Sequence, residues 1–469
     1  MVFSSLTFLL LFLPALLALY FICPKLKWRN AILLFFSLVF YAWGEPKWIV
    51  CMVGATLVNY LAALWMQKAK QQRWRRVALL AGVVVSLGAL VYFKYTNFFL
   101  SNLAALFGTA WTLPAVTLPI GISFYTFQIL TYTVDVYRGK AAVQRNPFKL
   151  LLYVSCFPQL IAGPIVQYTD IAAQLDARTT SLTDFGDGMG RFAVGLGKKV
   201  LLANLCGKML EALLGGGAAS TAGAWLSAIL YMLQIYFDFS AYSDMAIGLG
   251  RVLGFRYKEN FNYPYISDSV SGFWRRWHIS LGSFFREYVY IPLGGNRGGV
   301  AKTVRNLLIV WTLTGLWHGA SWNFLLWGVY YGVWIILERF VLQNVLTRIP
   351  KAIRILGTLL VVLFGWVLFY YTDLNAAFAH MGRMFGIGAD GLWNAALTET
   401  LRSYTVFPIA AAVCALPIVP ALKRFFFDHD NRRAWVGTAL QWCGQTAVLL
   451  LSVLALVGQS YNPFIYFRF

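Results

Sequence analysis

The sequence is short of charged residues, and of acidic residues most of all. Only 12% of its 469 residues are Asp, Glu, Lys or Arg, whereas soluble domains carry about 25%. The mean hydropathy is +0.64. These values exclude an ordinary soluble protein and predict a polytopic membrane protein. The apolar runs are long and interrupted by Gly, Pro and Trp, which favours helices in a bundle over the short alternating strands of a membrane barrel.

Basic residues outnumber acidic residues, 39 to 18, and the net charge is +21. They lie between the apolar runs and do not form one basic domain, so we expect no nucleic-acid partner. Lys and Arg are enriched in cytoplasmic loops of membrane proteins, where they meet anionic lipids. The basic segments 24–29, 67–76 and 138–149 therefore predict cytoplasmic loops and an N-terminus on the outer side.

Several familiar kinds of site are missing from the sequence. The six cysteines lie far from one another, mostly within or beside apolar segments, so we expect neither a disulfide framework nor a metal site. No H-E-x-x-H zinc motif and no G-x-S-x-G nucleophile elbow occurs. The sequence also has no phosphate-binding P-loop, which argues against ATP-driven transport.

The apolar runs predict ten to twelve membrane spans, on the order of 20 residues each, with no separate soluble domain and no internal repeat. No basic residue precedes the first run, 6–23, and no small-x-small cleavage site follows it, so we expect a retained helix. Residues 158–166 hold two prolines and one glycine in an apolar stretch. Such a stretch predicts a broken or re-entrant segment inside protein or beside a water-filled cavity. Residues 169–190 are polar and predict a surface loop with a short helix.

Histidine is also scarce, and one of the four lies in very apolar surroundings. His318 stands within WTLTGLWHGASWNFLLWG (311–328), a stretch without any acidic or basic residue. A charge buried in this way costs roughly 3 kcal/mol or more, but a neutral imidazole can take up a proton. This stretch alone leaves two interpretations open. His318 is either a catalytic base at the bottom of a membrane cavity or a core histidine bonded to a backbone carbonyl.

The other three histidines have different surroundings. His278 lies in a basic segment with Arg275 and Arg276, and neighbouring cations disfavour its charged form. A neutral His278 suits a hydrogen-bonding role in a site or, equally, a structural role in a loop turn. We expect His380, in a predicted outer segment, to be structural or solvated, and His429, on a polar loop, to be solvated.

Six stretches, taken together and in order, resemble one family. They are GISFYTFQILTYTVDVYRG (121–139), FPQLIAGPIVQY (157–168), FDFSAYSDMAIGLGRVLGF (237–255), FWRRWHISLGSFFREYVYIPLGGNRGG (273–299), LTGLWHGASWNFLLWG (313–328) and FIYFRF (464–469). They resemble the membrane-bound O-acyltransferases, and within them the bacterial branch that O-acetylates alginate and peptidoglycan. The motif IPLGGNR (291–297) is more similar to that branch than to the D-alanyl transfer proteins of teichoic acid.

The resemblance implies an all-α polytopic membrane protein, an MBOAT-like bundle of about 11 transmembrane helices with re-entrant segments and a central tunnel, in a single domain, 1–469. It implies acyl transfer within the tunnel. His278 matches the first of the family's two functional histidine positions, and His318 matches the second, which is usually treated as catalytic. The implied donor is acetyl-coenzyme A, with no permanently bound cofactor and no metal. The implied setting is the bacterial inner membrane, with a periplasmic N-terminus, a polysaccharide acceptor and a separate periplasmic acetyltransferase as partner.

Two further groups of residues are candidates for substrate contacts. Polar groups in apolar helices avoid lipid, so some could line the tunnel or else join helices. The candidate residues are Trp317, Asp238, Tyr242, Asp244 and Asn323. Cations on the predicted cytoplasmic side could hold the phosphates of coenzyme A or be ordinary loop charges: Arg275, Arg276, Arg297, Lys302 and Arg305.

Other functions stay open at this stage. Transfer of a D-alanyl or another acyl group would use the same kind of fold. A transporter or flippase with a histidine relay belongs to a different class, and such proteins often show broken helices in two matching halves. The sequence shows one such segment, 158–166, without a matching half. A non-catalytic scaffold would make both membrane histidines dispensable.

Overall fold

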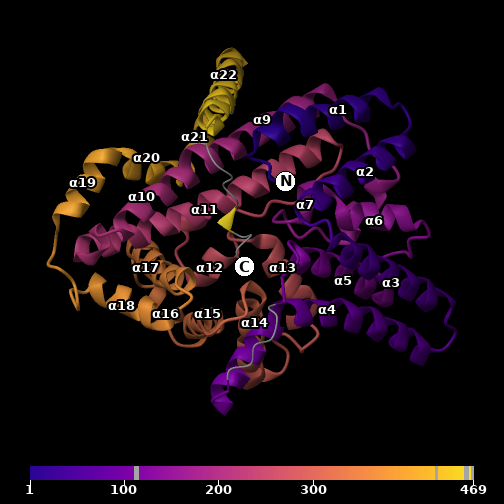
Figure 1. Cartoon of the computed structure of the whole chain (residues 1–469), viewed down its shortest axis with the longest axis horizontal. Helices are drawn as coiled ribbons and strands as arrows, with labels where there is room; N and C mark the ends of the chain where they lie inside the picture. The colour runs from indigo at the N-terminus through magenta and orange to yellow at the C-terminus, as the bar shows by residue number, and fades with distance from the viewer. Residues whose placement is uncertain (110–115, 428–430, 459–463, 466–469) are drawn as a thin grey trace. The chain divides into compact units, whose positions relative to one another are not determined.

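The computed structural model describes residues 1–109, 116–427, 431–458 and 464–465, and the regular structure in these residues is helical (Figure 1). The chain forms two compact units. Among the described residues, the first unit consists mainly of Met1–Phe192 and Tyr242–Lys258, and the second of Ala193–Ala241 and Glu259–Gly458. Two helices contribute residues to both units: α9 (Leu182–Gly197) and α11 (Thr221–Val252).

The first unit is built mainly from the N-terminal helices. These are α1 (Leu13–Ile22), α2 (Leu26–Gly44), α3 (Ile49–Lys68), α4 (Gln72–Phe107), α5 (Ile122–Arg138), α6 (Pro147–Ser155), α7 (Phe157–Leu160) and α8 (Tyr168–Ile171). Helices α3, α4 and α5 pack on one another, and the buried Asn59 joins all three. Its amide donates to the Ser86 hydroxyl (2.8 Å) and accepts from the Thr133 hydroxyl (2.6 Å). In an apolar medium such side-chain hydrogen bonds fix which helix faces meet.

The predicted broken segment is present in the first unit. After the single turn of α7, residues 161–167 are not helical, and all but Gln167 are buried. The chain bends so tightly that a Cβ at Gly163 would lie 2.6 Å from the Cα of Gln159. The Tyr153 hydroxyl donates to the carbonyl of Val166 (2.8 Å). Buried side chains therefore take the place of helical hydrogen bonds, as irregular backbone at membrane depth requires.

Ion pairs hold the polar segment 169–190. Each of its four acidic residues lies close to a basic residue of the first unit: Asp170 to Lys258, Asp176 to Lys149, Asp184 to Arg251 and Arg256, and Asp187 to Arg251. Hydrogen bonds from the two arginines hold the pKa of Asp184 well below its usual range. The sequence predicted a surface loop with a short helix here. The structure adds that ion pairs hold the segment to basic residues of the first unit.

The second unit contains most of the C-terminal helices. These are α10 (Asn204–Leu214), α12 (Val270–Trp274), α13 (Ile279–Phe285), α14 (Gly299–His318), α15 (Trp322–Phe340), α16 (Gln343–Leu346), α17 (Lys351–Tyr370), α18 (Leu374–Met384), α19 (Ala395–Tyr404), α20 (Phe407–Cys414), α21 (Ile418–Phe427) and α22 (Asn431–Leu456). Helices α14 and α15 form a tightly packed hairpin, and α15 also packs on α12 and α17. This arrangement places the end of α14, the start of α15 and the end of α17 around His318. The turn between α12 and α13 carries His278.

Two glycines allow the close packing of the α14–α15 hairpin. A Cβ at Gly315 would overlap the carbonyl oxygen of Phe324 and lie 3.1 Å from the Cα of Gly328. A Cβ at Gly328 would overlap the carbonyl oxygen of Trp311. Small residues at such crossings let helix backbones touch in a membrane. Gly315 lies one turn before His318, so the crossing also fixes the position of that histidine.

Replacing Gly315 with alanine should therefore destabilise the second unit. The added methyl group would meet backbone atoms that cannot move aside, and overpacking of this kind costs about 1–3 kcal/mol. We expect a lower midpoint of thermal unfolding in detergent. The matched control is Gly357→Ala on α17, where a Cβ would have no heavy atom within 4 Å. Equal midpoints for the two variants would contradict the proposed crossing.

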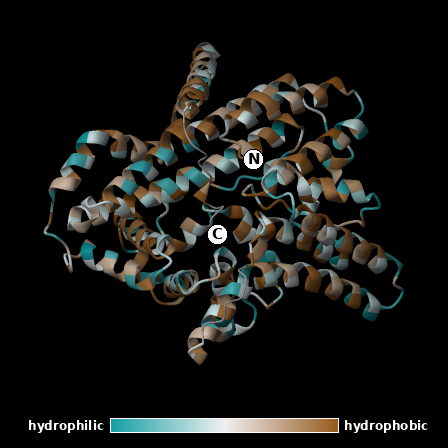
Figure 2. Ribbon diagram, viewed as in Figure 1, coloured by the Kyte–Doolittle hydropathy of each residue, from teal (hydrophilic) through white to brown (hydrophobic). Residues whose placement is uncertain are grey.

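The long apolar helices are those of a multi-pass membrane protein. Among the described residues, six helices are long and apolar enough to cross a membrane, or seven if the bent pair α20 and α21 is one span. The sequence prediction of about eleven is larger because it counts shorter apolar helices. Helix α5 has 17 residues, and α2 and α14 carry basic residues near their starts. Hydrophobic residues follow the long helices, while hydrophilic residues gather mainly at helix ends and turns (Figure 2).

Candidate active site

His318 lies inside a cage of aromatic rings in the second unit. It is the last residue of α14 and only 3% exposed. The rings of Trp317, Trp327 and Phe369 meet its imidazole edge to face, with centroids 5.0, 4.9 and 5.2 Å away. These rings come from α14, α15 and α17. The cage gives the imidazole a fixed orientation in apolar surroundings.

The position of His318 at the end of α14 influences its acid–base chemistry. The helix stops at His318 because Gly319 is extended, and a Cβ at Gly319 would overlap the ring of Phe324. Asn323, near the start of α15, donates to the carbonyl of Leu368 on α17 (3.3 Å) and so ties the turn to a third helix. Carbonyl groups at the carboxyl end of a helix stabilise a nearby positive charge. An imidazole in this position is suited to accept a proton transiently.

His278 lies in the turn between α12 and α13. It is 1% exposed, and its backbone is in the left-handed region, with φ of 46°. Its Nδ1 lies 3.2 Å from the amide oxygen of Asn260, and the ring of Phe239 meets it edge to face at 4.7 Å. Burial lowers the pKa of His278 to about 3, so this histidine is neutral at physiological pH.

The indole of Trp317 lies between the two histidines. Its ring centroid is 5.9 Å from that of His278 and 5.0 Å from that of His318. Residues that are 40 positions apart in the sequence thus meet the same side chain.

A carboxylate from α15 fixes the short helix that leads to His278. Glu338 accepts hydrogen bonds from the backbone N–H of Val270, the backbone N–H of Ser271 (2.9 Å) and the Ser271 hydroxyl (2.8 Å). A negative charge at a helix N-terminus satisfies its free N–H groups and its dipole. Sequence reasoning did not identify Glu338, because nothing in its own stretch links it to a residue 67 positions earlier.

Asp238 and Asn323, both predicted as tunnel residues, are in the second unit with the histidines. Asp238 on α11 forms a buried ion pair with Lys199, which lies on a π-helical turn (Lys198–Ala203) before α10. The Nζ–Oδ1 distance is 2.6 Å, and the side chains are 2% and 3% exposed. Next to Asp238 on the same helix is Phe239, which contacts His278. The pair therefore anchors the helix that supports the second histidine.

Tyr242 and Asp244, two further predicted tunnel residues, belong to the first unit. The Tyr242 ring stacks on that of Phe3, with a centroid distance of 4.6 Å. The Asp244 carboxylate accepts hydrogen bonds from the Arg191 guanidinium at 2.8 and 3.0 Å. Asp238, Tyr242 and Asp244 all lie on α11, and the unit boundary falls between Ala241 and Tyr242.

The five predicted phosphate-binding cations all belong to the second unit. Four have exposed side chains: Arg275, Arg297, Lys302 and Arg305. Arg276 is half-buried and donates to the carbonyl of Asn262 (3.1 Å). Arg297 precedes α14, and Lys302 and Arg305 lie in its first two turns. Arg297, Lys302 and Arg305 thus fall at the opposite end of α14 from His318, whereas Arg275 directly follows α12.

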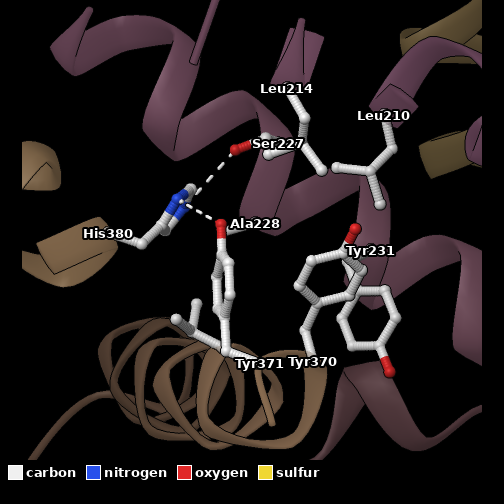
Figure 3. Close-up of a pocket in the computed structure, with 9 residues that line it drawn as sticks. Leu210, Leu214, Ser227, Ala228, Tyr231, Tyr370, Tyr371 and His380 are labelled. Carbon is white, nitrogen blue, oxygen red and sulfur yellow. Dashed lines mark hydrogen bonds between the residues drawn. The ribbon is translucent and has the colours of Figure 1, made fainter. Parts of the chain in front are cut away.

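His380 has a structural role in a small pocket of the second unit (Figure 3). Its Nε2 donates to the carbonyl of Ala224 (3.1 Å), and its Nδ1 accepts from the Tyr371 hydroxyl (3.0 Å). The nearby Ser227 hydroxyl donates to the same carbonyl (2.9 Å), so it is not poised as a nucleophile. Burial lowers the pKa of His380 to about 4. The sequence left a solvated or a structural histidine open, and the structural interpretation is confirmed. His429 lies outside the described residues.

Comparison with known proteins agrees with this architecture. A profile of the MBOAT, membrane-bound O-acyltransferase family matches residues 140–379. The chain is also 40% identical over 504 residues, covering both chains in full, to the probable alginate O-acetylase AlgI of Azotobacter vinelandii. The chain therefore belongs to the membrane-bound O-acyltransferase family and is a membrane-bound O-acyltransferase.

Two further relatives show how the similarity is distributed. The chain is 31% identical to the peptidoglycan O-acetyltransferase of Helicobacter pylori, over 92% of this chain and 90% of that protein. It is 28% identical to the teichoic acid D-alanyltransferase of Bacillus subtilis, over 46% of this chain and 57% of that protein. Similarity to the O-acetyltransferases thus extends over nearly the whole chain, whereas similarity to the D-alanyltransferase covers about half.

Proposed function

We propose that this enzyme moves an acetyl group from cytosolic acetyl-coenzyme A to a hydroxyl group on the periplasmic side of the bacterial inner membrane. The modified product is an exported or cell-wall polysaccharide of the alginate or peptidoglycan type. The observation that carries the proposal is the aromatic cage that holds His318 beside Trp317 and His278. The full-length similarity to O-acetylases supports the acetyl group and the polysaccharide.

The proposed reaction needs one general base and a site from which water is excluded. The hydroxyl oxygen attacks the thioester carbonyl carbon while Nε2 or Nδ1 of His318 takes the hydroxyl proton. The carbon–sulfur bond then breaks, and the imidazolium returns the proton to the thiolate, which leaves an ester and the coenzyme A thiol. The carboxyl end of α14 stabilises the transient imidazolium. The surrounding rings exclude water, which limits hydrolysis of the thioester.

The setting of the reaction follows from the charge pattern. The basic segments face the cytosol, and the N-terminus is periplasmic. Phosphates of coenzyme A bind the cations at the start of α14 and in the segment before His278: Arg275, Arg276, Arg297, Lys302 and Arg305. The thioester then reaches His318 through a central tunnel from the cytosolic side, and the acceptor hydroxyl reaches it from the periplasmic side. A separate periplasmic acetyltransferase receives the group or places it on the polymer.

The polysaccharide itself provides the test of this proposal. Inactivating the gene in its own host should remove O-acetyl esters from an exported or cell-wall polysaccharide, as measured by proton NMR of the purified polymer. Complementation with the wild-type gene should restore them. Unchanged acetylation would contradict the proposal. A loss of D-alanyl esters instead would support the second candidate, which the partial similarity to D-alanyltransferases raises.

A second prediction concerns His278. Its replacement by alanine should lower turnover by roughly 10²-fold or more, the usual contribution of a positioned acid–base or hydrogen-bonding group. Turnover is measured as coenzyme A thiol release by the purified enzyme with acetyl-coenzyme A and a hydroxyl acceptor. The midpoint of thermal unfolding should be measured alongside to confirm folding. A folded variant with nearly unchanged turnover would restrict His278 to a structural role.

A further inference from the structure

The side chain of Asn260 has three polar neighbours around a single atom. This residue is fully buried in the segment that follows α11. Its amide oxygen Oδ1 lies 3.1 Å from the backbone nitrogen of Ser280, 2.9 Å from the Ser280 hydroxyl and 3.2 Å from Nδ1 of His278. The three contacts converge from the turn that carries His278.

These contacts favour one position of the proton on the neutral ring of His278. The backbone N–H of Ser280 can only donate, so the amide atom that it meets must be the oxygen of Asn260 and not the nitrogen. An amide oxygen can only accept. When Nδ1 of His278 bonds to this oxygen, Nδ1 must be the donor; the Ser280 hydroxyl also lies near Nδ1, at 3.5 Å. In the neutral imidazole the proton then lies on Nδ1, and Nε2 presents a lone pair.

We propose that Asn260 is a positioning residue that holds neutral His278 in the Nδ1–H form, so that Nε2 acts as a hydrogen-bond acceptor toward the substrate. This inference rests on the proposed function for the identity of the substrate. The group that meets Nε2 must then be a donor, such as the O–H of the acceptor or the S–H of released coenzyme A. Neutral His278 cannot donate from Nε2 to the thioester carbonyl.

The surrounding structure is consistent with a fixed imidazole. The backbone N–H of Ile279 donates to the carbonyl of Asn260 (3.0 Å), which pins the turn to the same segment. The left-handed backbone of His278 is uncommon for a residue with a side chain and persists where the surroundings impose it. The ring of Phe239 and the indole of Trp317 contact the imidazole. Burial also keeps the ring neutral, and only the neutral ring has distinct tautomers.

Nitrogen NMR tests the tautomer without reference to turnover. The enzyme is labelled with ¹⁵N-histidine and studied by solid-state NMR in lipid at neutral pH. Only four histidines contribute signals, and the His278 pair is assigned by its loss in His278→Gln. We expect a protonated Nδ1 and an unprotonated Nε2. The reverse pattern, or a mixture of the two forms, would overturn the inference even if acetyl transfer is confirmed.

Substitutions at Asn260 test what the tautomer does. In Asn260→Leu, His278 should no longer be held in the Nδ1–H tautomer. The kcat should fall by about 10²-fold, with little change in the KM for acetyl-coenzyme A. Asn260→Asp keeps an acceptor oxygen, so it should retain a protonated Nδ1 and recover most of the lost kcat. The matched control is Asn262→Leu, because Asn262 is exposed and bonds to Arg276 through its backbone.

The outcomes separate this inference from the proposed function. If Asn260→Leu alters the tautomer but the wild-type enzyme transfers another acyl group, the positioning role stands and the donor assignment fails. If Asn260→Leu has wild-type kcat and an unchanged tautomer, the positioning role is wrong. An equal loss of kcat in Asn260→Leu and Asn260→Asp would also contradict it, because a retained acceptor oxygen should rescue.

Discussion

Replacing His318 with alanine is expected to lower acyl-transfer turnover by about 10²- to 10⁴-fold, the range that a positioned general base contributes. The imidazole is buried, oriented by three aromatic rings and placed at the carboxyl end of α14. Removing it takes away the proposed proton acceptor and leaves the cage. Turnover is measured as coenzyme A thiol release by purified enzyme, with the folded fraction determined on the same sample.

The chain offers a matched control for this experiment. His380 is another buried histidine of the second unit, but its ring bonds to the backbone of α11 and to Tyr371. His380→Gln should lower the midpoint of thermal unfolding and leave turnover per folded molecule near the wild-type value. A folded His318→Ala enzyme with full turnover would contradict the role proposed for His318.

Asp238→Ala is expected to lower the free energy of unfolding by about 3–5 kcal/mol, the usual result of removing one partner from a buried ion pair. The side chains of Asp238 and Lys199 are both almost fully buried and 2.6 Å apart. Loss of the carboxylate leaves the ammonium group of Lys199 in a medium that solvates it poorly. The free energy is compared by chemical denaturation of wild type and variant in the same mild detergent.

A double variant separates charge from packing at this site. Lys199→Met combined with Asp238→Leu removes both charges and keeps similar volumes, so it should recover most of the lost stability. Wild-type stability in Asp238→Ala would contradict the importance of the pair. A stable double variant with low turnover would show that Asp238 also acts in acyl transfer. That result would agree with the prediction that Asp238 lines the tunnel.

The sequence predicted the fold class and the two membrane histidines for different reasons. The fold class followed from low charge and long apolar runs, which are properties of the whole chain. His318 stood out because an ionisable residue is rare in so apolar a stretch, and His278 because it matches a family motif. Neither argument predicted that the indole of Trp317 would lie between them. That contact depends on how the turn after α12 packs against the end of α14.

The residues that support the histidines could not be read from the sequence. Lys199 and Asp238 are 39 positions apart on different helices, and no periodicity within one helix reveals a partner on another. Asn260 and Glu338 act through backbone N–H groups of distant segments. Such contacts leave no pattern in their own stretch. The positions of Trp327 and Phe369 around His318 are likewise set by helix packing, because aromatic residues are common throughout this chain.

The central claim is that the donor and the acceptor are on opposite sides of the membrane. One measurement in proteoliposomes tests this claim most directly. Acetyl-coenzyme A labelled in its acetyl group is added outside vesicles whose enzyme presents its basic loops outward. A polysaccharide acceptor, with a periplasmic extract, is trapped inside. We predict that labelled ester accumulates in the lumen with wild-type enzyme and not with His318→Ala. Label that stays on coenzyme A, or ester that forms only when donor and acceptor share one side, would contradict transfer across the membrane.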